Sequence, residues 1–300
     1  MANKEKIKSL SLVIPCNNEQ DAIRISLKVY FNILKDILKN KLISEFEVII
    51  VNNGSTDKTL DVLLDEKKNN DFKIINLKRN YGYTSSYLAG MYHAQNEMII
   101  TVSADLHEDP DKIKDMIKAH YLTNKPIMGC YKKRHETFLK NFFSNEYYRF
   151  MKIIKIPIIK NHADFRLITK EINTNFFNYL PSFVFIRIRI LDFIDSHEKI
   201  FYVGNDRRIG KTKFNFISSL FLALDTILFY AKSFLKKLIL SITIFSWLFF
   251  ILSLILVGKI KVFSILFIIS LMLTLFYFLI HIRIKSLENL NEHFQVKEIL

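Results

Sequence analysis

The sequence predicts an α/β protein, in which a Rossmann-like, doubly wound and mostly parallel sheet precedes a C-terminal hairpin of two transmembrane helices. Two observations predict this fold class. Short apolar runs alternate with amphipathic stretches through residue 131, at the spacing of strand–helix units. Nearer the C-terminus, from Leu238 to Ile282, the chain carries no Asp, Glu, Lys or Arg except Lys259 and Lys261.

The expected strands are apolar runs that are each bounded by polar or turn-forming residues. In order, they are SLVIP at 11–15, FEVIIV at 46–51, FKIINL at 72–77, MIITV at 98–102 and PIMGCY at 126–131. The helices expected between them span residues 21–39, 57–68, 84–94 and 110–120. In the first helix the apolar residues recur at helical spacing, namely Ile23, Leu27, Phe31, Leu34 and Leu38. This alternation indicates a parallel sheet with helices on both faces.

Beyond residue 131 the regular alternation of expected strands and helices ends. A helix is expected over 138–154, where aromatic and basic residues mix, and another follows the segment HADFRLITK (162–170) as far as about residue 180. Mixed segments then continue through IFYV (200–203). The α/β domain is therefore expected to occupy residues 1–213.

The remaining residues predict association with a membrane. The spans 238–257 and 262–282 each have about the 20 apolar residues that a helix needs to cross a bilayer. A buried helical pair of a soluble protein is the alternative. Residues 214–237 are apolar but carry one acid and three lysines, which suits amphipathic helices at the membrane interface and, nearly as well, a core helix pair. Residues 283–300 are expected to form a cytoplasmic tail.

The charges around the apolar spans predict their orientation. Lys232, Lys236 and Lys237 precede the first span, and Arg283 and Lys285 follow the second, whereas the tip between the spans carries two lysines. By the positive-inside rule, the α/β domain and both chain ends are expected in the cytoplasm. The charged start MANKEKIKS predicts no signal peptide.

The overall charge limits the expected partners. A formal net charge of +14 at pH 7 suits an anionic membrane surface or phosphorylated ligands. No nucleic-acid recognition motif is evident, and the predicted membrane anchor argues against a nucleic-acid partner. Cys16 and Cys130 are isolated and lack metal-ligand spacing, so they are expected to be buried thiols.

Polar segments follow four of the expected strands: PCNNE, VNNGSTD, LKRNYGY and SADLHEDP. The carboxyl ends of parallel strands meet at one edge of a sheet, where ligands bind. Gly54 permits a tight turn, and Ser55 or Thr56 can cap the next helix. Arg79 and Asn80 suit contacts to phosphate or ribose. Each segment alone is equally well explained as an ordinary turn, but together they predict one ligand site.

Three acids gather after the strand MIITV in a chain that is otherwise basic: Asp105, Glu108 and Asp109. Beside phosphate-binding loops, carboxylates suit Mg²⁺ or Mn²⁺, which prefer oxygen ligands and bridge carboxylate to diphosphate. Asp105 is the best placed ligand. Glu108 and Asp109 also suit a second role, the stabilisation of the first turn of the helix that Pro110 begins.

Seven segments in order carry a resemblance to a known family: PCNNE, VNNGSTD, RNYGY, the small residues Ala89, Gly90 and Ala94, SADLHEDP, ADFRL and RRIGKTKF. Together they resemble family 2 glycosyltransferases of the GT-A fold. More narrowly, the chain is similar to the polyprenyl-phosphate glycosyltransferase branch, which includes bactoprenol glucosyltransferases and dolichol-phosphate mannose synthases. The match runs from about Leu10 to Phe214, and the two-span tail also resembles the bacterial members.

The resemblance implies which residues bind the donor and the metal ion. The nucleotide sugar would contact Pro15, Asn18, Glu19, Asn53, Asp57, Arg79, Asn80, Ser103, Ala104 and Asp105. Asp105 matches the metal-binding acid of the family, which holds Mg²⁺ or Mn²⁺. His107 stands where glutamine is usual, and His107 or Glu108 is a further candidate ligand.

The resemblance also implies the reaction centre. Asp164 and Arg166 match its catalytic pair, in which Asp164 is either a base or the residue that orients Arg166. The acceptor and the diphosphate would meet Lys140, Tyr148, Arg207 and Lys213.

The function implied is that of an enzyme, an inverting glycosyltransferase that moves a hexose from a nucleotide sugar to undecaprenyl phosphate. It would act at the cytoplasmic face of the bacterial inner membrane, for the modification of cell-surface glycans. UDP-glucose is the first choice of donor, with UDP-N-acetylhexosamine, UDP-galactose and GDP-mannose open. A homo-oligomer is also open, because relatives with this tail can form one.

Two rival functions remain. One is a family 2 enzyme that acts on a sugar hydroxyl of a lipid-linked oligosaccharide or polysaccharide. The other is a membrane-anchored nucleotide-sugar-binding protein with a degraded catalytic site. Three departures from the family pattern favour the second rival: Ser103 replaces the first acid of the D-x-D motif, Asn53 replaces a usual aspartate, and Tyr83 replaces a usual lysine.

Overall fold

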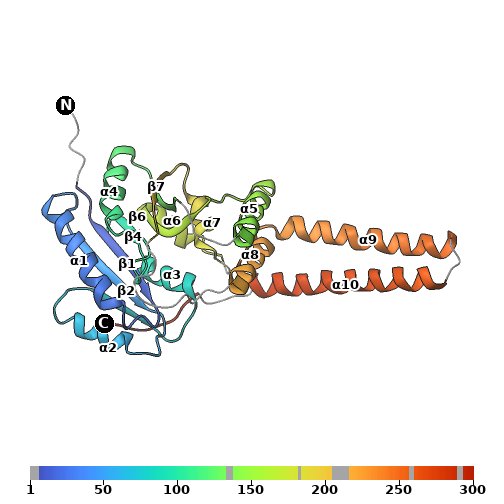
Figure 1. Cartoon of the computed structure of the whole chain (residues 1–300), viewed down its shortest axis with the longest axis horizontal. Coiled ribbons are helices and arrows are strands. Elements are labelled where there is room, and N and C mark those ends of the chain that lie inside the picture. Colours follow the sequence, from blue (N-terminus) through green and yellow to red (C-terminus); the bar gives the residue numbers. More distant parts are fainter. Residues whose placement is uncertain (1–6, 133–137, 182–183, 205–215, 257–259, 289–292) are drawn as a thin grey trace. The chain divides into compact units, whose positions relative to one another are not determined.

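The computed structural model describes residues 7–132, 138–181, 184–204, 216–256, 260–288 and 293–300. These residues form two compact units. The first contains the sheet and the helices that cover it, and the second contains three apolar helices (Figure 1).

The first unit follows the predicted alternation of strands and helices. Its elements are β1 (Leu10–Cys16), α1 (Ile23–Lys39), β2 (Phe46–Asn52), α2 (Thr59–Glu66), β3 (Lys73–Leu77), α3 (Tyr83–His93), β4 (Met98–Thr101), α4 (Lys112–Thr123), β5 (Ile127–Tyr131), α5 (Phe138–Ile153), β6 (His162–Thr169), α6 (Lys170–Asn178), α7 (Ile186–Arg189), the 3₁₀ helix η1 (Ile190–Phe193), β7 (Glu198–Tyr202) and β8 (Val296–Ile299).

The eight strands form one sheet in the order β7-β5-β6-β4-β1-β2-β3-β8. Strands β1 to β4 are parallel to one another where they pair, and β7 is parallel to β5. Strand β6 is antiparallel to both β4 and β5, and β8 is antiparallel to β3. The predicted α/β fold class is confirmed, with a sheet that is mixed at β6 and at the β8 edge.

Helices cover both faces of the sheet because the central strands are apolar on both sides. Leu12 and Ile14 of β1 belong to a core that also contains buried residues of α1, α2 and α4. Val13, between them, belongs to a second core with buried residues of α3, α6 and α7. Successive side chains of a strand point to opposite faces, so β1 contributes to both cores.

The same alternation orients the functional part of β6. Phe165 and Leu167 belong to the core with α1 and α4. Asp164 and Arg166 therefore point to the opposite face, where α3, α6 and α7 pack. Because β6 is antiparallel to β4, its first residues lie at the carboxyl end of β4, next to the loop that follows Thr101.

The last residues of the chain differ from the predicted tail. Helix α10 (Ile260–Glu288) continues past Ile282, and β8 then pairs with the edge strand β3. Asn76 of β3 is only 4% exposed, and its side-chain Nδ2 donates to Glu298 Oε1 at 2.8 Å. Strand β8 thus covers the open edge of β3, which would otherwise present unpaired backbone groups.

The second unit consists of α8 (Phe216–Tyr230), α9 (Lys232–Leu256) and α10. Two stretches, Lys232–Leu252 and Phe267–Glu288, are long and apolar enough to cross a membrane. Only 11% of each is buried within the structure, whereas a core helix of a soluble protein would be mostly buried. The low burial favours the predicted hairpin over the buried helical pair.

Polar contacts join the helices of this unit. Trp247 Nε1 of α9 donates to Thr274 Oγ1 of α10 at 3.0 Å, and Lys232 pairs with Glu288 at 2.7 Å. The predicted boundary between residues 237 and 238 falls inside α9, which is continuous from Lys232. Lysine is a good helix former, and its long side chain can carry its charge to a membrane surface.

Candidate active site

Hydrogen bonds join the loops that follow β1 and β2. The Asn18 N–H donates to Ser55 Oγ at 3.0 Å, and Asn18 Oδ1 accepts from the Thr56 N–H at 2.8 Å. The Glu19 N–H donates to Thr59 Oγ1 at 2.8 Å. Asn18 has a φ of 52°, in the left-handed region that asparagine tolerates better than most residues. The two loops therefore form one polar surface at the edge of the sheet.

Asp57 holds this junction together. Its Oδ1 accepts from the N–H and the hydroxyl of Thr59 at 3.0 and 2.5 Å, and its Oδ2 accepts from the Gln20 N–H at 3.3 Å. Partial burial by itself raises the pKa of a carboxyl group, but the hydrogen bonds from Thr59 and Gln20 outweigh it, so the pKa of Asp57 lies below its ordinary value. Asp57 is thus an ionised acceptor between the two loops.

Asn53 connects these loops to the third one. Its side chain is buried, and its Nδ2 donates to the Gly82 carbonyl at 3.0 Å and to Asn80 Oδ1 at 3.2 Å. Its Oδ1 accepts from the Tyr81 N–H at 3.0 Å. An amide can donate and accept at once, whereas an ionised carboxylate only accepts. These contacts use both the donor and the acceptor of the Asn53 amide, which an aspartate could not provide.

Gly54 lies very close to the third loop. It has a φ of 60°, and a Cβ at this position would lie 2.2 Å from the carbonyl carbon of Arg79 and 2.4 Å from the Asn80 nitrogen. The Arg79 side chain stacks over Tyr81, with 4.9 Å from its guanidinium carbon to the ring centroid. Arg79 is exposed, so it presents a cation at this edge of the sheet.

The structure thus brings one group of predicted donor residues together at the carboxyl ends of β1, β2 and β3: Pro15, Asn18, Glu19, Asn53, Asp57, Arg79 and Asn80. Pro15 is buried in β1 and lies opposite Val51 of β2.

After β4, the acidic loop folds back on itself. Glu108 is buried, and its Oε2 accepts from the N–H of Ser103 at 3.0 Å and from the Ser103 hydroxyl. Tyr30 of α1 donates to the Ser103 carbonyl at 2.8 Å. Burial raises the pKa of Glu108, which the hydrogen bonds from Ser103 only partly offset. Helix α4 begins at Lys112, so Glu108 stabilises the loop rather than the first helical turn predicted for it.

Asp105 is partly exposed at the start of this loop, and its Oδ1 accepts from the His107 N–H at 3.2 Å. The His107 ring packs against Tyr131, with centroids 5.5 Å apart. Ala104, between Ser103 and Asp105, is buried in the core with α1 and α4.

Asp105 can supply one carboxylate to a divalent ion whose other ligands would come from a bound nucleotide. Within the described residues, no three His, Cys, Asp or Glu side chains gather as a metal site. Mg²⁺, however, is often held by one or two carboxylates together with substrate phosphates. Asp105 would supply the carboxylate, while the carboxylate of Glu108 is engaged with Ser103.

Asp164 lies between two arginines. Arg166 Nη2 donates to Asp164 Oδ1, and Arg187 of α7 donates to Oδ2 through Nε at 2.9 Å and Nη2 at 2.7 Å. The side chains of Asp164 and Arg166 are 6% and 1% exposed, and that of Arg187 is 31% exposed. The Thr101 hydroxyl donates to the Asp164 carbonyl, which ties this residue to the end of β4.

The charges of this cluster decide its chemistry. Burial by itself raises the pKa of a carboxyl group, but the charges of Arg187 and Arg166 outweigh it and hold the pKa of Asp164 far below its ordinary value. Burial lowers the pKa of His162, which is therefore neutral. Two guanidinium groups against one carboxylate leave an excess of one positive charge. The cluster can attract an anion, and Asp164 is a weak base.

The predicted acceptor residues have different outcomes. Tyr148 lies in α5, and its hydroxyl accepts from the Asn161 N–H at 3.1 Å, one residue before β6. It therefore fastens α5 to the strand that carries Asp164. Lys140 belongs to α5, and Arg207 and Lys213 lie outside the described residues.

Arg187 is the residue of this cluster that the sequence did not predict. The segment FIRIRI (185–190) alternates apolar and basic residues, a pattern more typical of an exposed strand than of a binding helix. In the structure, Ile186 and Ile188 are buried and α7 is a single short helix. This alternation is the one feature of the sequence that could have drawn attention to Arg187. It predicts a strand, whereas Arg187 lies in a helix.

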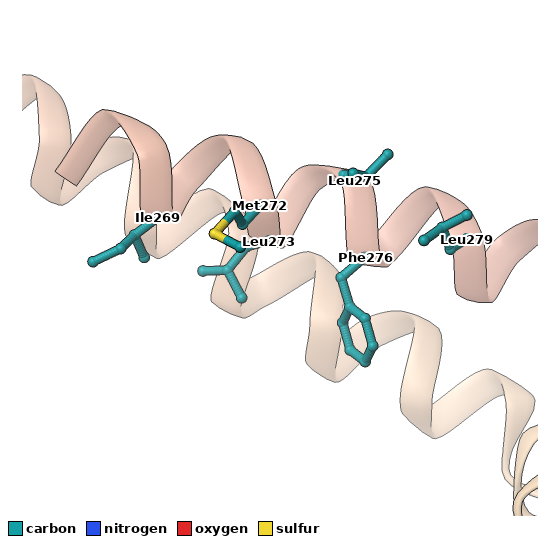
Figure 2. A pocket seen from close by; sticks show the side chains of 6 residues that line it. All are labelled: Ile269, Met272, Leu273, Leu275, Phe276 and Leu279. Atoms are coloured by element: carbon teal, nitrogen blue, oxygen red, sulfur yellow. The ribbon is translucent and has the colours of Figure 1, made fainter. Parts of the chain in front are cut away.

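An apolar hollow of about 450 Å³ lies along α10 (Figure 2). Six side chains of this helix line it: Ile269, Met272, Leu273, Leu275, Phe276 and Leu279. These side chains can contact hydrocarbon but supply no catalytic group.

Comparison with known proteins identifies a family. The model for "Glycosyl transferase family 2" matches residues 11–195. The uncharacterized glycosyltransferase YkoT of Bacillus subtilis is 30% identical over 213 residues, which cover 68% of this chain and 62% of that protein. The uncharacterized glycosyltransferase sll0501 of Synechocystis is 31% identical over 228 residues, 73% of this chain and 68% of that protein.

Two further matches either cover less of the chain or share less of its sequence. An undecaprenyl-phosphate 4-deoxy-4-formamido-L-arabinose transferase of Photorhabdus laumondii is 35% identical over 116 residues, 38% of this chain and 34% of that protein. The solved structure of the mannosyltransferase PcManGT of Pyrobaculum calidifontis, in complex with GDP-Man and Mn²⁺, aligns with a TM-score of 0.49 at 15% identity and covers 69% of this chain and 59% of that chain. Since the family model matches more than half of the residues, this chain belongs to glycosyl transferase family 2.

Proposed function

We propose that the protein transfers a hexose from a nucleotide sugar, with UDP-glucose as the first choice, to the phosphate of a polyprenyl lipid such as undecaprenyl phosphate. The reaction inverts the anomeric carbon. The observation that carries the proposal is the Asp164 carboxylate held between Arg166 and Arg187.

The state of Asp164 favours an acceptor that is already ionised. A sugar hydroxyl needs a general base with a pKa near the working pH to take up its proton. Both Asp164 oxygens are occupied by guanidinium groups, which hold its pKa far below neutrality. A phosphate monoester has a second pKa of about 6 and is mostly ionised near pH 7. A phosphate acceptor therefore needs no base here, unlike the hydroxyl acceptor of the rival function.

The charges of the cluster suit the same reaction. An anionic acceptor that attacks a nucleoside diphosphate sugar brings several negative charges together, and fixed cations at that point lower the barrier. Arg166 and Arg187 supply two of them. Asp105 would hold Mg²⁺ or Mn²⁺ against the donor diphosphate, and the bound ion would act as a Lewis acid on the leaving nucleotide.

The second unit supports a lipid acceptor. The two apolar spans expose most of their surface, as helices in contact with lipid do. The Photorhabdus relative, which matches 38% of this chain, is named as an undecaprenyl-phosphate transferase. Together with the lysines that flank the spans, these findings support action at the cytoplasmic face of a bacterial inner membrane.

The test uses purified full-length protein in detergent, with radiolabelled UDP-glucose, UDP-N-acetylglucosamine, UDP-galactose and GDP-mannose. Undecaprenyl phosphate and undecaprenol are offered separately as acceptors. We expect label only in the phosphorylated lipid and only with added Mg²⁺ or Mn²⁺. Transfer to undecaprenol but not to its phosphate would reject the proposal.

A variant at Asp105 tests the proposed metal-binding role separately. Asp105→Ala is expected to lower the rate of transfer about 100-fold or more, because the leaving diphosphate loses its main counter-charge. The amount of protein in the membrane fraction should stay at the wild-type level. If the variant transfers sugar at the wild-type rate, Asp105 does not hold the metal ion.

A further inference from the structure

Arg187 is the member of the charged cluster that can reach a ligand. Its side chain is 31% exposed, whereas those of Asp164 and Arg166 are 6% and 1% exposed. Ile186 and Ile188, on either side of it, are buried, so the short helix α7 is held in place. Its Nε and Nη2 are both directed at Asp164 Oδ2. One guanidinium group is thus fixed in orientation while part of it remains open to solvent.

Among the described residues, Arg187 has tyrosines as well as charged groups for neighbours. Three tyrosines from three elements lie near it: Tyr83 of α3, Tyr131 of β5 and Tyr202 of β7. Tyr131 also packs against His107, in the loop that carries Asp105. Arg187 therefore lies between β6 and the loop that is expected to meet the donor diphosphate.

The net positive charge of the cluster favours an anionic ligand. Among the described residues, Asp164 is the one acid in ion-pair contact with Arg187, and it is shared with Arg166. The cluster keeps an excess of one positive charge. In the proposed reaction the anions that reach the reaction centre are phosphate groups, and the planar fork of arginine matches phosphate oxygens.

We propose that Arg187 binds a phosphate oxygen during the reaction, and that Asp164 is the positioning residue that holds the Arg187 guanidinium toward it. The inference rests on the proposed function and names a residue for its phosphate subsite. The phosphate belongs either to the lipid acceptor, a monoester, or to the donor, a diphosphate, and the experiment separates these two sources.

The variant Arg187→Lys keeps the positive charge but loses the fork that can contact Asp164 and a ligand together. The matched control is Arg189→Lys in the same helix. Arg189 pairs with Asp192 at 2.7 Å and stacks over Phe193, with 4.9 Å from its guanidinium carbon to the ring centroid. Calorimetry on the full-length proteins in detergent measures two probes, citronellyl phosphate as the monoester and UDP as the diphosphate.

We expect Arg187→Lys to weaken the binding of one probe by about 10- to 100-fold, the range for a lost hydrogen bond to a charged group. Arg189→Lys should stay within about threefold of wild type for both probes. Loss confined to citronellyl phosphate assigns Arg187 to the acceptor, and loss confined to UDP assigns it to the donor. If Arg187→Lys unfolds, Arg187→Gln is compared with Arg189→Gln. Arg187→Gln keeps an N–H donor for Asp164 but removes the positive charge, so the same probe should lose at least as much affinity.

Two outcomes overturn the inference. One is unchanged binding of both probes by a folded Arg187 variant. The other is equal weakening of both probes by the Arg187 and Arg189 variants, because general damage to α7 then explains the loss. A wild-type protein that binds citronellyl phosphate but transfers no sugar to undecaprenyl phosphate would reject the proposed function and leave the Arg187 assignment intact.

Discussion

At the scale of single residues, the chemistry of Asp164 depends on the two guanidinium groups that it binds. The motif ADFRL places Asp164 and Arg166 on one face of β6, because residues two apart in a strand share a face. The third partner, Arg187, is 23 residues further along the chain. A local motif therefore predicts the pair, whereas the second ion pair appears only when α7 packs on the sheet.

We predict that Asp164→Asn lowers the free energy of unfolding by about 3 kcal/mol or more near pH 7. The uncharged amide leaves the buried Arg166 and the half-buried Arg187 without a counter-charge. Thermal unfolding of the full-length protein in detergent, compared with wild type, measures this loss. A variant as stable as wild type would show that the ion pairs contribute nothing to the fold.

The loss of stability in Asp164→Asn should also depend on pH. The pKa of Asp164 is lower in the folded than in the unfolded chain, so its stabilising contribution is fully present above the unfolded value of about 4 and is lost as the pH falls further. The gap in stability between wild type and Asp164→Asn should therefore stay constant above about pH 5 and narrow below about pH 4. A gap that is unchanged at about pH 3 would contradict this linkage.

At the scale of elements, three loops at the carboxyl ends of β1, β2 and β3 depend on close backbone contacts. Gly54 is the closest of these contacts, with a backbone conformation that suits glycine. We predict that Gly54→Ala shifts the loop at Arg79 and Asn80, destabilises the protein by about 1–3 kcal/mol and weakens UDP binding. Calorimetry with UDP and thermal unfolding measure the two effects.

Gly82→Ala is the matched comparison. Gly82 also has a positive φ, of 88°, but a Cβ there would meet no atom within 4 Å. It therefore adds backbone strain without a collision between loops. If Gly54→Ala and Gly82→Ala weaken UDP binding equally, the contact between the loops at Gly54 is not what shapes the donor site.

The elements themselves were largely predictable. Strands β1 to β5 and helices α1 to α5 lie within a few residues of their predicted positions, because apolar periodicity is a local property of the sequence. Strand β8 was not predicted. Its four residues, Val296–Ile299, form a strand because they pair with the edge strand β3. Asn76 of β3 donates a hydrogen bond to Glu298, which is 222 residues away in the chain.

At the scale of the whole molecule, the two native cysteines make the orientation of the chain measurable. Cys16 and Cys130 are buried, and burial raises the pKa of the Cys130 thiol to about 11. Both should react slowly with maleimides, which attack thiolates. We predict that Lys261→Cys, at the start of α10, is labelled by a membrane-impermeant maleimide on intact cells.

Ser286→Cys, near the other end of α10, is the control for this measurement. It should be labelled only after the cells are permeabilised, because the hairpin is expected to place the two ends of α10 on opposite sides of the membrane. Labelling of Ser286→Cys but not of Lys261→Cys in intact cells would show that the orientation is the reverse of the predicted one. Labelling of both variants before permeabilisation would reject the membrane hairpin.

The sequence by itself determined the strand–helix order, the two apolar spans and the gathering of polar segments at the strand ends. These depend on side chains that are near one another in the chain, so a local pattern is enough to predict them. Only the tertiary structure decided which distant groups meet. Asn53 binds the loop at residues 80–82, and Arg187 binds Asp164. Such contacts depend on how the elements pack, because burial makes an ion pair or a hydrogen bond necessary wherever two polar groups are enclosed together.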